Sequence, residues 1–145
     1  MKTPITRVGV GLAAVLLGIG ADGCASHSQD TGTGSVKTIP QLGAEMEQNG
    51  VMSQSDYIRQ HALAQTVRRT HTITEADLTW TLAQLHNEKN SIARARAFNI
   101  LAEIRPMSAA QKSRILPAIA PYLAGSDRLD QLGALRVQKS VQAGG

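Results

Sequence analysis

The chain has 145 residues, of which 42% are hydrophobic, and it contains one Phe, one Trp and two Tyr. Fifteen Lys and Arg against eleven Asp and Glu give it a formal net charge of +4. This length limits the chain to one domain, and the scarcity of aromatic residues predicts a core of Ala, Leu and Ile, which suits helices. Because no aromatic stacking platform accompanies the basic residues, nucleic acid is not an expected partner.

The first 23 residues have the layout of a signal peptide. Lys2 and Arg7 form a positively charged segment, residues 8–19 are apolar and uncharged, and residues 21–23 have short side chains. The apolar run has twelve residues, whereas about twenty are needed to span the hydrocarbon layer of a membrane. The segment therefore predicts export with removal of residues 1–23, and not a permanent transmembrane helix.

Cys24 is the only cysteine in the chain, so it cannot form an intrachain disulfide. It follows Gly23 at the expected cleavage site, and this arrangement resembles the lipobox of bacterial lipoproteins. The resemblance implies that Cys24 is acylated and anchors the protein to a membrane, because two acyl chains hold firmly where one does not. If the host is Gram-negative, Ala25 implies the outer membrane, with the protein facing the periplasm. Ala21 and Asp22 stand where the lipobox usually has leucine and a small uncharged residue, so ordinary cleavage to a soluble periplasmic or secreted protein is the alternative.

Residues 24–50 are rich in Ser, Thr, Gly and Gln and poor in large apolar residues. This composition predicts a flexible tether after the lipidated cysteine, to which residues 41–48 could add a helical turn or two. The tether would let the following domain stand clear of the lipid headgroups.

Residues 51–142 predict a helical domain of about five helices. The first is expected over residues 54–69, and the second follows Thr74, an N-cap with Asp77 three residues on. Trp80 lies off the apolar stripe of the second helix and is expected to fill a groove against a neighbouring helix. The expected core positions of these two helices are Tyr57, Ile58, Leu63, Val67, Leu78, Leu82 and Leu85.

The third helix is expected over residues 91–105, between the cap Asn90 and Pro106. The fourth begins at a capping box formed by Ser108 and Gln111. The expected core positions of these two helices are Ala93, Ala97, Phe98, Leu101, Ile104, Ile115, Leu116, Ile119, Tyr122 and Leu123.

Pro117 and Pro121 fall inside the fourth helix, where each removes a backbone donor, and they predict a kink or a split at residues 116–118. A fifth helix follows Ser126 or Asp127. Its expected apolar positions are Leu129, Leu132, Leu135 and Val137.

Displacing the sequence by 37 residues pairs apolar residues with apolar residues over two successive helix pairs. The matches are Leu78/Ile115, Leu82/Ile119, Ala83/Ala120, Leu85/Tyr122, Ile92/Leu129, Ala97/Ala134, Phe98/Leu135, Ile100/Val137 and Ile104/Val141. Over residues 91–142 this pattern resembles HEAT-like repeats, in which antiparallel helix pairs stack into an α-solenoid. Arg94 and Arg96 stand near the ladder positions of that family, whereas Gln131 and Gly133 take these places in the next unit. The expected fold is all-α, either a small bundle or a short HEAT-like α-solenoid.

The C-terminal part of the chain is its cationic part. Residues 41–90 carry four basic and six acidic groups, and residues 91–145 carry eight basic and three acidic groups. On an exported protein this charge predicts an anionic lipid or cell-wall polymer as the counterpart, or a solvated face without a partner. The candidate binding residues are Trp80, as an aromatic anchor, and the basic residues Arg94, Arg96, Arg105, Lys112 and Arg114.

The sequence contains none of the common catalytic or metal-binding motifs. Its four histidines form no pair at metal-ligand spacing, and it has no Gly-rich phosphate loop, no G-x-S-x-G and no H-E-x-x-H. We therefore expect a lipid-anchored envelope protein that binds a protein or a cell-wall polymer, without catalysis, cofactor or metal. The alternative is a soluble periplasmic helical protein, chaperone-like or stress-related, without a lipid anchor.

Overall fold

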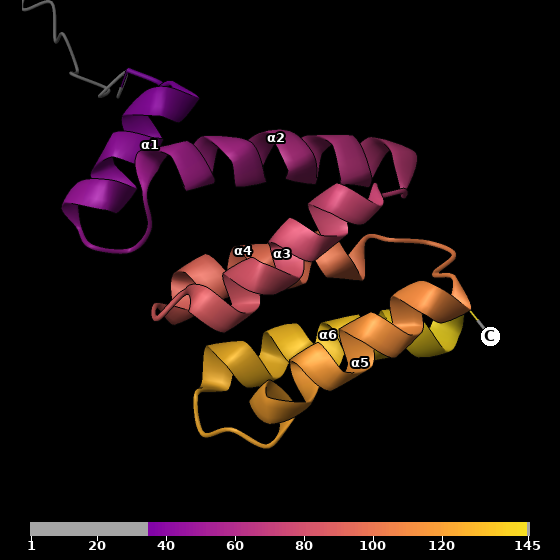
Figure 1. Ribbon diagram of the computed structural model, residues 1–145. Helices are drawn as coiled ribbons and strands as arrows, with labels where there is room; N and C mark the ends of the chain where they lie inside the picture. Colours follow the sequence, from indigo (N-terminus) through magenta and orange to yellow (C-terminus); the bar gives the residue numbers. More distant parts are fainter. Residues whose placement is uncertain (1–34, 145) are drawn as a thin grey trace, which may run out of the picture. The chain divides into compact units, whose positions relative to one another are not determined.

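The structure is a computed structural model that describes residues 35–144, and these form six helices packed into a small all-α bundle (Figure 1). The signal peptide, Cys24 and the first part of the expected tether lie outside the described residues. Among the described residues, no helix combines the length and the apolar character needed to cross a membrane. The helices are α1 (Ile39–Gln48), α2 (Gln54–Thr70), α3 (Glu75–Asn87), α4 (Ser91–Ala102), α5 (Ala109–Leu123) and α6 (Arg128–Ala143).

Helix α1 lies where the sequence analysis expected the end of the tether. Thr38 and Gln41 form a capping box at its start, and its buried Gly43 packs against α2. A Cβ on Gly43 would lie 3.2 Å from Tyr57 Cδ1, so the two helices approach each other closely there. A short helix gains most of its stability from such packing and little from its own propensity, which is why composition did not reveal it. The helical part thus begins at residue 39, and it has six helices where about five were expected.

The expected starts of the other helices are confirmed. The capping side chains are Ser53 for α2, Thr74 for α3, Asn90 for α4, Ser108 for α5 and Asp127 for α6. Each accepts a hydrogen bond from a backbone N–H in the first turn, which would otherwise lack a partner. Helix α4 ends at Ala102, three residues before the expected end.

Helix α5 runs unbroken through Pro117 and Pro121, so the expected split at residues 116–118 is not present. Both prolines are exposed. Ser113 and Pro117, whose carbonyl groups lose their intrahelical donors, are exposed residues too.

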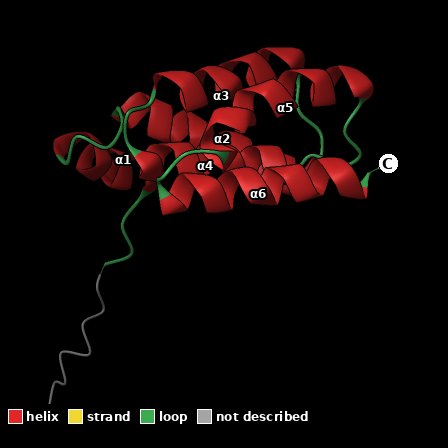
Figure 2. Ribbon diagram, turned by 90° about the horizontal axis from the view of Figure 1, so that it is seen from below, coloured by secondary structure: helices red, strands yellow, loops and turns green. Residues whose placement is uncertain are grey.

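Hydrogen bonds between helices recur at a nearly constant sequence separation. The separations are 36 for Arg94–Asp130, 37 for Arg136–Asn99, 38 for Ser140–Ala102, 36 for Arg96–Gln60 and 37 for Tyr122–Leu85. Since the partners advance together along α4 and α6, these two helices run parallel. Consecutive helices pack as the pairs α1–α2, α3–α4 and α5–α6, which Figure 1 shows as three tiers. In Figure 2, α3 and α5 lie on one side of the bundle, and α4 and α6 lie on the other.

The largest fully buried side chain among the described residues is Phe98 on α4. The Tyr122 ring of α5 meets it edge-on at a centroid distance of 5.3 Å. On the other side α6 comes so close that a Cβ on Gly133 would lie 2.4 Å from Phe98 Cδ2. A glycine at this position therefore allows the close contact between α4 and α6.

Five apolar residues expected in the core are exposed instead, by 38% to 48% of their surface. They are Ile58, Leu116, Leu129, Leu132 and Leu135. The buried residues of α6 are Asp130, Ala134, Val137 and Val141. Since α6 belongs to the last helix pair, no following pair within the described residues covers its far side, and its leucines lie there.

Candidate functional site

Arg94 is part of the interior and is not an available surface cation. Its Nε and Nη2 donate to the two carboxylate oxygens of Asp130 at 2.9 and 2.6 Å, and its Nη1 donates to the Glu88 carbonyl at 2.8 Å. The side chains of Arg94 and Asp130 are 13% and 6% exposed. The hydrogen bond to Asp130 raises the pKa of the Arg94 guanidinium above its usual value. This pair joins α4 to α6.

Three other predicted cations lie on α5 and in the loop that precedes it. Arg114 on α5 forms an ion pair with Glu75 of α3 at 2.6 Å, and Arg105, in the α4–α5 loop, forms one with Glu103 at 3.3 Å. Lys112 Nζ donates to the Gly144 carbonyl at 3.4 Å. Arg94, Arg105 and Arg114 are thus each paired with a carboxylate, so three of the five predicted cations are not free charges.

Trp80 is half-buried against the core, as its position off the apolar stripe suggested. The guanidinium carbon of Arg59 lies 4.2 Å from the centroid of the Trp80 ring, and Arg59 also pairs with Asp77 at 3.5 Å. These contacts connect α2 to α3, so much of the indole is used within the fold.

Arg96 is held by a ring and an amide, and not by a carboxylate. It is half-buried, and among the described residues it forms no ion pair. Its guanidinium carbon lies 4.3 Å from the centroid of the Tyr57 ring, and its Nε donates to Gln60 Oε1 at 3.0 Å. Stacking and this bond fix the orientation of the guanidinium, while its positive charge stays without a counter-ion in the described part of the chain.

Gln60 is 1% exposed, and its Nε2 has no hydrogen-bond partner among the described residues. Because Oε1 accepts from Arg96, turning the amide over would place two donors against each other. The atom without a partner is therefore a donor. A buried donor without an acceptor costs free energy, so this position is unusual for a purely structural side chain.

Gln60 and Arg96 line a cleft of about 140 Å³ between α2 and α4, which we call the α2–α4 cleft; its other lining residues are His61, Ala64, Gln65, Arg68 and Asn99. Arg68 is exposed and forms no ion pair within the described residues. Asn99 Oδ1 accepts from Arg136 at 2.9 Å, so its amide nitrogen is left as a donor. The cleft has two guanidinium groups and no carboxylate, and it is rich in donors.

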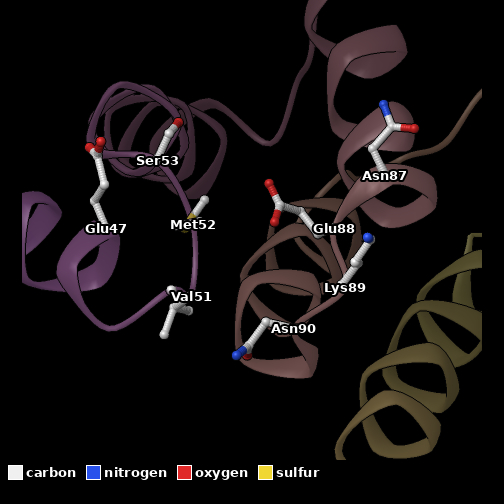
Figure 3. A pocket seen from close by; sticks show the side chains of 9 residues that line it. Glu47, Val51, Met52, Ser53, Asn87, Glu88, Lys89 and Asn90 are labelled. Atoms are coloured by element: carbon white, nitrogen blue, oxygen red, sulfur yellow. The ribbon is translucent and has the colours of Figure 1, made fainter.

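A larger cleft of about 560 Å³ lies between the α1–α2 turn and the α3–α4 turn (Figure 3). Its carboxylates belong to Glu47 and Glu88. Burial raises the pKa of the Glu88 carboxyl, the negative charge of Asp56 adds to this, and Arg94 opposes it. In Figure 3 the Glu88 carboxylate points toward the α1–α2 turn, and the Lys89 amine points away from it. Across residues 35–144, no three His, Cys, Asp or Glu side chains come close enough together to hold a metal.

The comparisons with known proteins do not assign the chain to a family. No family model, curated protein or solved structure matches it.

Arg96 was predicted from the sequence to belong to a binding site, whereas Gln60, Arg68 and Asn99 were not. Gln60 could have been noticed in the sequence, because it falls on the apolar stripe of α2 between Tyr57 and Leu63. A polar residue at such a position is worth marking as a candidate. Arg68 and Asn99 are exposed polar residues on helices, and only the packing of α2 beside α4 identifies them as neighbours.

Proposed function

We propose that this protein is exported, is anchored to a membrane of the cell envelope by lipid on Cys24, and serves there as a small helical binding module without catalytic activity. The anchor rests on the sequence of residues 1–24. In a Gram-negative host the anchor would lie in the outer membrane, and the module would face the periplasm.

For the module we propose a short HEAT-like α-solenoid of three helix pairs. The observation that supports this architecture is the recurring separation of 36 to 38 residues between bonded partners on α2, α4 and α6. Stacked helix pairs of this kind form extended binding surfaces. The half-buried Arg96, without an acidic partner in the described residues, marks the α2–α4 cleft as the binding part of that surface.

A soluble periplasmic protein with a chaperone-like role is the second candidate. It is favoured by the exposed leucines of α6, since Leu129, Leu132 and Leu135 are each more than 40% exposed and apolar surface can hold apolar segments of other proteins. In this case Cys24 would carry no lipid, and α6 would be the binding element.

Two experiments test the proposal in the native host. The Cys24→Ser variant should move from the detergent phase to the aqueous phase on detergent partition, and intact-mass analysis of the unaltered protein should give the added mass of the acyl chains. A photo-cross-linking amino acid at the exposed Gln65, beside the α2–α4 cleft, should capture a partner in intact cells, whereas the same group at the exposed Ala120 of α5 should not. Partition that does not depend on Cys24 contradicts the anchor, and equal capture from both positions contradicts the assignment of the binding face.

A further inference from the structure

We propose that the α2–α4 cleft binds a carboxylate group of an acidic polypeptide segment. This inference names the ligand of the binding module and therefore rests on the proposed function. Its starting point is Arg96, a half-buried residue whose guanidinium has no counter-ion among the described residues. A partly desolvated charge without a partner costs free energy, and a carboxylate in the cleft would remove that cost.

The donors around Arg96 fit a carboxylate. Its Nε is used by Gln60, and the Tyr57 ring holds the guanidinium plane, so its terminal nitrogens are fixed in place. A planar pair of N–H donors matches the two oxygens of a carboxylate. Arg68 adds a second cation at the rim, and the Asn99 amide nitrogen adds a neutral donor.

The geometry favours a polypeptide over a membrane surface. Arg96 lies recessed between two helices and beside an aromatic ring, whereas lipid headgroups on a flat membrane meet the outermost cations first. A water molecule takes about 30 Å³ in the liquid, so a cleft of about 140 Å³ has room for the carboxylate end of an Asp or Glu side chain. The amides of Gln65 and Asn99 can bind the peptide groups beside such a side chain.

The test measures binding of a fluorescein-labelled decapeptide of alternating Glu and Gly with an amidated C-terminus. The purified full-length protein is used in mild non-ionic detergent, and the reference probe is the same peptide with Gln in place of Glu. Fluorescence anisotropy should show binding of the Glu peptide that weakens with added salt, and little binding of the Gln peptide. Equal binding of both peptides would overturn the proposal.

Three variants that each remove one positive charge locate the site. Arg96→Gln should weaken binding of the Glu peptide by about tenfold or more, and Arg68→Gln by about threefold, because charge-assisted hydrogen bonds are lost. The matched control is Arg128→Gln, at an exposed position on α6, which should change binding by less than about twofold. Equal losses in all three variants would mean diffuse attraction by net charge and would overturn the proposal. The Arg68 side chain makes no hydrogen bond within the described residues, so its variant keeps the test valid if Arg96→Gln does not fold.

Two further measurements distinguish other ligands and separate this inference from the proposed function. The side-chain amide resonances of Gln60 should shift in NMR spectra on addition of the Glu peptide. Binding of anionic phospholipid vesicles and of inorganic phosphate is measured under the same conditions. If either binds more tightly than the Glu peptide and its binding depends on Arg96, that ligand and not an acidic polypeptide occupies the cleft. If no peptide binds while cross-linking from Gln65 persists in cells, the carboxylate inference fails and the binding module stands. If cross-linking is also lost, both fail.

Discussion

Gly133→Ala tests how closely α4 and α6 approach each other. The new Cβ would lie 2.4, 2.8 and 3.0 Å from Cδ2, Cγ and Cβ of Phe98, whereas carbon atoms in contact normally lie about 3.5–4.0 Å apart. Phe98 is fully buried and its ring meets Tyr122 edge-on, so the ring has little room to turn away. The alanine can be accommodated only if the two helices separate.

Two opposing effects set the size of the loss. Overpacking of a well-packed core costs about 1–3 kcal/mol, and the upper half of that range applies here because the clash is with atoms close to the backbone of Phe98. Alanine in place of glycine inside a helix gains about 1 kcal/mol. We expect Gly133→Ala to lower the free energy of unfolding by about 1–2 kcal/mol, measured by urea denaturation followed by far-ultraviolet circular dichroism.

A double-mutant cycle and a control glycine show whether the clash is the cause. In a Phe98→Leu background, which removes the ring, Gly133→Ala should cost at least about 1 kcal/mol less than in the unaltered protein. Gly144→Ala should change stability by less than about 0.5 kcal/mol, because the nearest atom to its Cβ lies 4.0 Å away. A stabilising Gly133→Ala, or a cycle without coupling, would refute the close packing of α4 on α6.

Three other substitutions follow from the structure. Arg94→Met should lower the free energy of unfolding by about 3 kcal/mol, because it leaves the Asp130 carboxylate buried and unpaired. The double variant Arg94→Met/Asp130→Leu should recover part of this loss in the same urea assay. If Arg94→Met costs less than about 1 kcal/mol, the pair is not a buried one. Glu88 has a raised pKa in the fold, so its ionisation destabilises the protein as pH rises above the ordinary glutamate pKa of about 4.3. Glu88→Gln should therefore be more stable than the unaltered protein at neutral pH, with a difference that disappears in acid, and an offset that is the same at every pH would contradict this. Leu135→Gln should change stability by less than about 0.5 kcal/mol, since Leu135 is 41% exposed, and a thermal melt that shows a larger loss would place it in the core.

The all-α fold and the starts of the helices could be predicted because both depend on local sequence. Thr74 and Ser108 are followed within one turn by the residues that complete their caps, and the structure has caps at both. Helix α1 has a local signal of the same kind, the capping box of Thr38 and Gln41, but it lies in a stretch whose composition predicted a tether. Its packing, with Gly43 close to Tyr57, is a contact between elements that local sequence does not reveal.

The face that each helix buries was harder to predict than its position. On α6 the leucines suggested one stripe, but the buried face contains Asp130, which the sequence analysis did not place in the core. Asp130 is buried because Arg94 on the neighbouring helix pairs with it, and this depends on a residue 36 positions away. Leu132, on the expected stripe, is 48% exposed. Periodicity gives the apolar stripe of a helix, but not which part of that stripe a neighbouring element covers.

The contrast between Arg94 and Arg96 links the fold to the proposed site. Both lie on α4, but Arg94 meets the acidic Asp130 of α6, whereas Arg96 meets the neutral Gln60 of α2. Gln60→Glu would give Arg96 an internal counter-ion, and since Arg96 is already half-buried, we expect the free energy of unfolding to rise by about 1 kcal/mol.

The same change should weaken binding of the Glu peptide by about tenfold or more, because the new carboxylate would occupy the donors and repel the ligand. Gln60→Met is the matched control, since it removes the polar amide without adding charge. If Gln60→Glu is less stable than the unaltered protein and still binds the peptide, a negative charge beside Arg96 is not favourable, and the cleft is not a carboxylate site.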